Sequence, residues 1–321
     1  MLKPLVYVDG HFRNNIDLAD ISEFIKVKEN MVWLDVENPT ADDIALLHEE
    51  FEFHHLSLED AVHQQQRPKI DEYGAYFFLV AHSLTYNPEE LEMRWQEVDL
   101  FVGRNYVVTV HMEPVAALKT SLERAEKHPQ MLTEGVGFLV YSIMDAIIDE
   151  YMPILEVIDD QVDDIEQGIF HEFRESAIED IFKLKRELLK IRRTAAHLRD
   201  VFNVLCRRDN PLFTANQLVY FQDIYDHLYR VTDSVDIYRE VLSGALEAYL
   251  SINANNLNNI MKVFGGWSII LMSGALIAGI YGMNFEFMPE LKMKFGYSGA
   301  LVAMLIVGLI ELAIFKKKKW L

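Results

Sequence analysis

Side chains that could guide a hydrated cation form two rows in the last third of the chain, with successive members seven positions apart. The first row comprises Glu247, Ala254, Met261, Ser268 and Ala275, and the second comprises Ser251, Asn258, Gly265, Met272 and Gly279. A helix that packs around a central axis presents such a row to that axis. Carboxamide oxygens accept hydrogen bonds from the water around an ion. The rows therefore predict a small and polar lining for an ion path.

Two apolar segments near the C-terminal end are long enough to cross a bilayer, which takes about 20 residues. No charged residue occurs in Val263–Phe285, and Phe295–Phe315 contains only Glu311. We expect Glu311 to pair with the lysines that follow it. The sequence therefore predicts two transmembrane helices within residues 263–315. The alternative is a pair of buried helices in a soluble protein.

The flanking residues predict an orientation for these spans. Lys316–Lys319 lie in a basic tail, residues 316–321, and basic residues beside a span tend to stay in the cytosol. Met1 to Asp17 contains no long apolar run, so we expect the N-terminus to stay in the cytosol too. Both termini would then be cytosolic in an inner or plasma membrane, with residues 282–294 as an outer loop.

Charge and cysteine content exclude several classes of protein. The 321 residues include 50 acids and 30 Lys or Arg, for a formal net charge of −20, which argues against a nucleic-acid partner. The single cysteine, Cys206, cannot form an intrachain disulfide or a cysteine metal cluster. His55, Glu59 and His63 follow at helical spacing, but no nucleophile or phosphate-binding loop accompanies them. We therefore expect a capped surface helix there and no enzyme.

The elements upstream of the spans predict an α+β membrane protein with an N-terminal cytosolic α/β domain in residues 1–130. We expect helices at Ala41–Phe51 and Leu58–Gln66, the second starting with a capping box of Ser57 and Asp60. Short runs rich in β-branched and aromatic residues predict strands at Leu5–Asp9, Val32–Val36, Ala75–Ser83, Glu97–Val102 and Tyr106–His111.

Residues 131–262 are expected to form a cytosolic helical hairpin and a stalk. Apolar residues at helical spacing predict helices at Leu132–Phe170, which Pro153 could interrupt, and at Phe173–Arg208. Thr214 and Gln217 resemble a capping box, and the proline-free stretch after them predicts one helix of roughly 100 Å. Two spans cannot enclose a hydrophilic path alone, so transport would require a homo-oligomer.

Tyr281-Gly282-Met283-Asn284, at the end of the first predicted span, is followed by Phe285-Glu286-Phe287-Met288-Pro289-Glu290-Leu291. This segment resembles the signature and outer loop of the CorA family of magnesium transporters. Its position between two spans, and the terminal Lys-Lys-Lys-Lys-Trp-Leu, strengthen the resemblance. It covers the whole chain in architecture and is best after Tyr220.

The resemblance implies a funnel-shaped homopentamer in the lipid bilayer, with the first span lining the pore and the second surrounding it. Gly282, Met283 and Asn284 would form the selectivity filter, where Gly282 permits a close turn and five Asn284 side chains meet the hydrated ion. The other residues that the resemblance and the rows assign to the pore and gate are Glu247, Asn258, Met261, Phe264, Met272 and Gly279.

The implied activity is passive, potential-driven uptake of Mg²⁺, with Co²⁺ and Ni²⁺ as further substrates, and closure by intracellular Mg²⁺. Asp223 matches one regulatory acid of the family, whereas Asn87 stands where its partner acid would be, with Glu89 and Glu90 close by. Ser273 likewise replaces a common proline. Two alternatives stay open: a zinc transporter of the same superfamily, and a membrane-anchored metal sensor or scaffold that conducts nothing.

Overall fold

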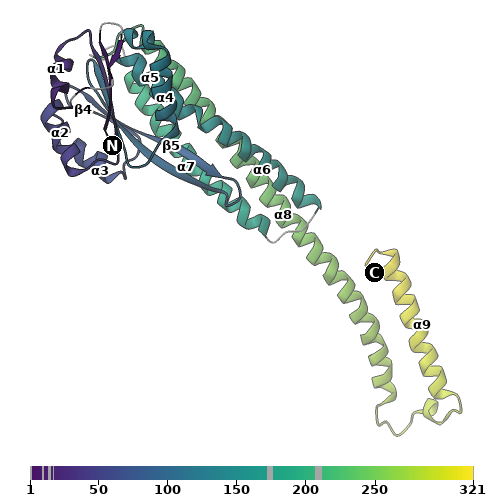
Figure 1. Cartoon of the computed structure of the whole chain (residues 1–321). Coiled ribbons are helices and arrows are strands. Elements are labelled where there is room, and N and C mark those ends of the chain that lie inside the picture. Colours follow the sequence, from purple (N-terminus) through teal and green to yellow (C-terminus); the bar gives the residue numbers. More distant parts are fainter. Residues whose placement is uncertain are drawn as a thin grey trace. The chain divides into compact units, whose positions relative to one another are not determined.

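The computed structural model describes residues 2–8, 11–13, 16, 18–171, 176–206 and 212–320. Contacts divide the chain into two compact units, residues 1–245 and 246–321, which are considered separately below (Figure 1). The longest helix, α8 (Leu218–Tyr281), contributes residues to both units.

The first unit is built on a seven-stranded mixed sheet. Its strands are β1 (Leu2–Val8), β2 (His11–Arg13), β3 (Met31–Glu37), β4 (Lys69–Glu72), β5 (Phe77–Asn87), β6 (Glu92–Val102) and β7 (Tyr106–His111). Their order is β2-β1-β3-β7-β6-β5-β4; β3 and β7 pair in parallel and the other described pairs are antiparallel.

All five expected strands are present, although Asp9 lies outside the described residues. Strands β2 and β4 were not expected, because both are short and neither reads as a run of β-branched and aromatic residues. Strands β5 and β6 are longer than expected and pair in register from Phe77 opposite Val102 to Asn87 opposite Glu92. The resulting hairpin carries polar residues beyond the buried part of the sheet.

One core cluster joins the sheet to the helices α1 (Ile21–Lys26), α2 (Ala41–Phe51) and α3 (His55–His63). Helix α2 has the expected bounds and is capped by Thr40. The Thr40 hydroxyl oxygen accepts a hydrogen bond from the backbone N–H of Asp43, and the Asp43 carboxylate accepts one from the backbone N–H of Thr40. Fully buried members of the cluster include Leu34, Leu47, Phe53, Phe78 and Phe101.

The predicted start of α3 is wrong. Ser57 lies inside the first turn, where its hydroxyl donates to the carbonyl of His54 at 2.8 Å. The N-cap is His54, whose Nδ1 accepts from the backbone N–H of Leu56 at 3.2 Å. The helix ends at His63, before the expected Gln66, because Gln64 adopts a left-handed conformation with φ of 43°.

Besides the start of α8, the described part of the first unit contains four further helices: α4 (Ala116–Lys127), α5 (Val136–Asp149), α6 (Tyr151–His171) and α7 (Ser176–Leu205). The expected helix over 132–170 is divided at Glu150. Pro153 explains this break. In a continuous helix its ring would clash with the carbonyl of Asp149, and its nitrogen has no hydrogen to donate to that carbonyl. Phe173 and Arg208, the expected bounds of the next helix, lie outside the described residues.

Short 3₁₀ helices link several elements: η1 (Leu18–Asp20), η2 (Pro129–Glu134) and η3 (Pro289–Lys292). Helix α8 begins at Leu218, four residues after the expected cap, and one bond of the expected capping box is present: the backbone N–H of Thr214 donates to Gln217 Oε1 at 2.9 Å. Gln217 Nε2 also donates to the carbonyl of Glu134 at 2.7 Å, which ties the start of α8 to η2. The 64 residues of α8 correspond to roughly 96 Å of helix.

The second unit contains the end of α8 and the helix α9 (Gly296–Lys317). Both helices are long and apolar enough to cross a membrane, and only 6% of the most apolar window of each is buried. A soluble protein would bury such helices in its core, so the alternative of two buried soluble helices is wrong. Apolar surface exposed along both helices is what immersion in lipid predicts.

Candidate ion pathway and metal centre

The predicted gate residues lie on the exposed surface of α8 in the second unit. Met261, Phe264 and Met272 are 70%, 73% and 70% exposed. The opposite face of α8 packs against α9: Gly266 is buried, and a Cβ on Gly308 would lie 3.8 Å from the Ile270 side chain. The predicted gate residues therefore belong to the face of α8 that α9 leaves uncovered.

The remaining predicted pore residues, Glu247, Asn258 and Gly279, are also exposed. Leu271 on α8 is 72% exposed, so exposure in a single chain does not distinguish a pore-facing side from a lipid-facing one. The assignment of these residues to a pore therefore stays a prediction.

The predicted selectivity filter forms the turn that ends α8. The backbone N–H of Gly282 donates to the carbonyl of Ala278 at 3.0 Å, and that of Met283 donates to Ile280 at 3.2 Å. A Cβ at Gly282 would lie 3.4 Å from the Ala278 carbonyl, an ordinary contact, so the turn itself does not require glycine there. Asn284 follows in the loop with its side chain exposed, free to meet solvent or another copy.

One polar contact joins α8 to α9 at membrane depth. The hydroxyl of Ser273 donates to Glu311 Oε2 at 2.9 Å. Within residues 212–320, Glu311 forms no ion pair with the lysines that follow it, so the expected pairing is not seen and a helix-to-helix hydrogen bond stands in its place. A polar pair in hydrocarbon satisfies groups that would otherwise be costly to expose to lipid, and it fixes the register of the two helices.

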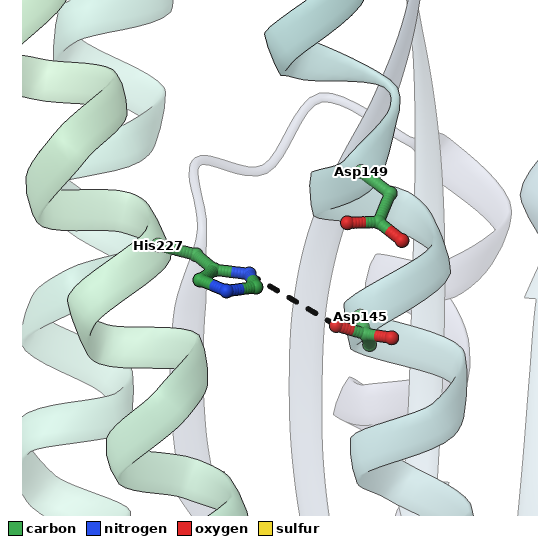
Figure 2. A group of neighbouring side chains, drawn as sticks. All are labelled: Asp145, Asp149 and His227. Carbon is green, nitrogen blue, oxygen red and sulfur yellow. Dashed lines mark ion pairs between the residues drawn. The ribbon is translucent and has the colours of Figure 1, made fainter.

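A candidate metal centre lies in the first unit, between α5 and α8. Asp145, Asp149 and His227 each offer one ligand atom, and these atoms lie within 4.8 Å of one another. Figure 2 shows the carboxylates on successive turns of α5, facing the imidazole of α8, with His227 Nδ1 4.0 Å from Asp145 Oδ1. Among the described residues this is the one such cluster of three ligand residues.

Acidic neighbours make this centre electronegative. Asp223, one turn before His227 on α8, has Oδ1 3.6 Å from His227 Nε2 and accepts a hydrogen bond of 3.2 Å from the Tyr141 hydroxyl. Burial, followed by the charge of Asp149, raises the pKa of the Asp145 carboxyl. Burial and the charges of Asp145 and Asp223 likewise raise the pKa of the Tyr141 hydroxyl. A bound cation would relieve this repulsion.

The ligand types indicate which cations fit. Carboxylate oxygens suit Mg²⁺, whereas an imidazole nitrogen suits transition metals such as Co²⁺ and Ni²⁺. Asp145 also lies 3.6 Å from Arg124 Nη1, a contact that a cation would weaken.

Glu89 and Glu90, the other predicted regulatory acids, lie in the turn between β5 and β6. Asn87 organises this turn: its side chain accepts from the Glu89 backbone N–H at 3.1 Å and donates to Glu90 Oε2 at 3.0 Å. Within the described residues, neither glutamate forms a hydrogen bond or ion pair with Asp223. One protomer therefore does not bring the predicted set together.

Asp145, Asp149 and His227 were not predicted as ligands from the sequence. The two α5 acids share a face at a spacing of four, as His227 and Asp223 do on α8. That shared spacing was the available signal. The discarded set of His55, Glu59 and His63 forms no metal cluster in the described chain, and His63 Nδ1 instead contacts the carbonyl of Glu59 at 2.9 Å.

Comparison with known proteins agrees with this architecture. The model of the CorA-like Mg²⁺ transporter protein family matches residues 28–317. The cobalt/magnesium transport protein CorA of Thermotoga maritima is 34% identical over 336 aligned positions, covering 99% of this chain and 95% of the relative. The Bacillus subtilis protein YfjQ is 37% identical over 290 positions, covering 90% and 89% of the two chains.

Solved structures support the fold over its whole length. The complete structure of the CorA magnesium transporter from Methanocaldococcus jannaschii superposes with a TM-score of 0.85 at 22% identity, covering 99% of both chains. The full-length CmaX protein superposes with a TM-score of 0.76 at 19% identity, covering 99% of this chain and 97% of that one. With the family model matching nine-tenths of its length, the chain belongs to the CorA family of divalent cation transporters.

Proposed function

We propose that this protein conducts Mg²⁺ passively into the cytosol as a hydrated ion, with Co²⁺ and Ni²⁺ as further substrates. The observation that carries the proposal is the signature segment 281–291, which follows directly on a long helix whose last turns are apolar and exposed. The relative from Thermotoga maritima is named for cobalt and magnesium transport, which supports this choice of ions.

Assembly into a homopentamer would supply the path that one chain lacks. Each copy exposes Met261, Phe264 and Met272 on the face of α8 that α9 does not cover. Copies arranged around an axis would bring these apolar side chains into rings, which can close a pore by excluding water. Gly279 and Asn258 would leave room for water between the rings.

Selection would occur at the outer mouth, where five Asn284 side chains would form a ring. Mg²⁺ gives up its water reluctantly, so carboxamide oxygens that accept bonds from those waters can select it without dehydration. The membrane potential would drive entry: two charges at about 2.3 kcal/mol each per 100 mV correspond to about 4.6 kcal/mol. This direction requires cytosolic termini, which the lysine tail favours.

Closure by cytosolic Mg²⁺ would use the centre at Asp145, Asp149, His227 and Asp223. Cation binding there would neutralise the repulsion that raises the pKa of Asp145. Glu89 and Glu90, which do not reach Asp223 within one protomer, would contribute from a neighbouring copy and so tie the copies together.

The experiment is flux of Mg²⁺ into proteoliposomes with a magnesium-sensitive dye inside and an inside-negative potential. Uptake that rises with the potential and falls when Mg²⁺ is added on the cytosolic face supports the proposal. Uptake of Zn²⁺ with no uptake of Mg²⁺ would favour zinc transport. Absence of flux for every divalent cation, in a correctly assembled preparation, would favour a sensor or scaffold.

A further inference from the structure

A cleft of about 400 Å³ lies in the first unit between α7 and the sheet at β4, β5 and β6. Helix α7 contributes one face to it, with residues at helical spacing, and the segment between α3 and β4 forms a rim. The residues that line it are Gln65, Gln66, Arg67, Pro68, His82, Trp95, Lys190, Arg193, Thr194 and His197. Its volume falls within the range of small-molecule sites.

The charge of this lining is opposite to that of the protein. The chain carries a formal net charge of −20, yet the cleft is lined by Arg67, Lys190 and Arg193 and by no aspartate or glutamate. Lys190 forms an ion pair of 2.7 Å with Glu187. Arg67 and Arg193 are exposed and have no ion pair with any described residue. Two guanidinium groups therefore face the cleft with their donors available.

Two nitrogens of residues that line the cleft lack hydrogen-bond partners in the described part of the chain. The indole Nε1 of Trp95 and the Nδ1 of His82 are both buried and unpartnered among the described residues. Burial lowers the pKa of His82 to about 4, so this ring is neutral at pH 7. A buried N–H without an acceptor is costly, and an oxygen-rich ligand would satisfy the one on Trp95.

We propose that this cleft binds a small phosphate-bearing anion of nucleotide size. The forked donors of arginine match phosphate oxygens in a bidentate manner, and Lys190 and Thr194 on α7 add further donors. Trp95 and Pro68 supply apolar surface for a planar group such as a nucleobase. The binding site is separate from the ion pathway and from the centre at Asp145, and it would report the cell's phosphate-ester pool to the transporter.

Binding is measured on the purified full-length protein by equilibrium dialysis with radiolabelled ATP, in EDTA so that no metal bridges the ligand to the acidic surface. We expect saturable binding that weakens at least about tenfold in R67E and in R193E. R186E is the matched control, because Arg186 is an exposed arginine two turns earlier on α7 that does not line the cleft. Affinity in R186E should equal that of the wild type.

Competing ligands test the chemical class. If pyrophosphate displaces radiolabelled ATP at concentrations similar to those of unlabelled ATP, the site recognises the phosphates. If only unlabelled ATP and ADP displace it, the site recognises the whole nucleotide. Both outcomes support the site. Displacement by citrate as effective as by pyrophosphate would overturn the phosphate assignment. Equal weakening in R67E, R193E and R186E, or no saturable binding by the wild type, would overturn the proposal.

Discussion

Replacing Asp145 with asparagine should change the stability of the protein in opposite directions with and without Mg²⁺. In the metal-free protein, Asp145 faces Asp149 and Asp223, and its raised pKa shows that its charged form is disfavoured. D145N removes that repulsion, so the metal-free variant should melt at a higher temperature than the wild type. The same change removes a charged ligand, so the variant should gain less from Mg²⁺.

The size of the metal effect follows from linkage. A ligand present at 100 times its Kd stabilises a folded protein by about 2.7 kcal/mol. For a unit of about 245 residues, each kcal/mol corresponds to roughly 2–4 °C in Tm, so Mg²⁺ should raise the Tm of the wild type by roughly 5–11 °C. In D145N the increment should fall below roughly 3 °C, since loss of one charged ligand weakens binding strongly.

Thermal unfolding of the full-length protein in detergent, in EDTA and in MgCl₂, measures both effects. D160N is the matched control, because Asp160 is an exposed acid on α6 outside the cluster. It should behave like the wild type in both buffers. An undiminished Mg²⁺ increment in D145N, or an equal loss in D160N, would refute the assignment of this centre.

Three further predictions concern protons, metals and the helix pair. The Mg²⁺ increment in Tm should shrink as pH falls from 7 to 5. Burial raises the pKa of the Asp145 carboxyl, so protons compete with Mg²⁺ for this ligand at a higher pH than at an ordinary aspartate; a pH-independent increment would contradict this. H227A should reduce the Co²⁺ increment more than the Mg²⁺ increment, with H63A unchanged, as melts in each metal will show. S273A and E311L should each destabilise the protein. A double-mutant cycle of thermal melts should give a coupling free energy between the two substitutions of about 0.6 kcal/mol. Strictly additive effects would mean that the hydrogen bond contributes nothing to stability.

A buried acid in the sheet gives a separate pH prediction. Burial raises the pKa of Glu97, whose side chain is 5% exposed, to about 7. The folded state then binds more protons than the unfolded chain between about pH 4.5 and 7, so stability from this group is lost as pH rises through that window. E97Q should therefore stabilise the protein at pH 8 by up to about 3 kcal/mol and leave it nearly unchanged at pH 4.5 in denaturant unfolding. A destabilised E97Q at pH 8 would contradict this.

Local signals predicted most of the architecture. The charge-free run after Lys262 and the lysines after Phe315 were sufficient to find both spans, and the helix expected at Ala41–Phe51 has the bounds of α2. The start of α3 was mistaken because Ser57 and Asp60 resemble a capping box, whereas in the structure the Ser57 hydroxyl bonds the His54 carbonyl and the Tyr76 hydroxyl, and His54 supplies the cap.

The candidate site was harder to predict, because its parts are far apart in sequence. Asp145 and His227 are brought together only by the packing of α5 against α8, and no local pattern encodes that pairing. The contact between Ser273 and Glu311 likewise depends on the register of two helices. The proposed ring of Asn284 side chains would be formed by several copies of the chain. The sequence of one copy therefore predicts which chemical groups the ring contains, but not how they are arranged.

The central claim is that Asn284 selects the hydrated ion, and the flux of Mg²⁺ through N284A tests it most directly. Wild-type and variant proteins are reconstituted into liposomes at equal density, after size-exclusion chromatography has shown the same assembly for both. The account predicts rapid uptake by the wild type under an inside-negative potential and loss of most of that uptake in N284A. Equal Mg²⁺ flux through both proteins would contradict it.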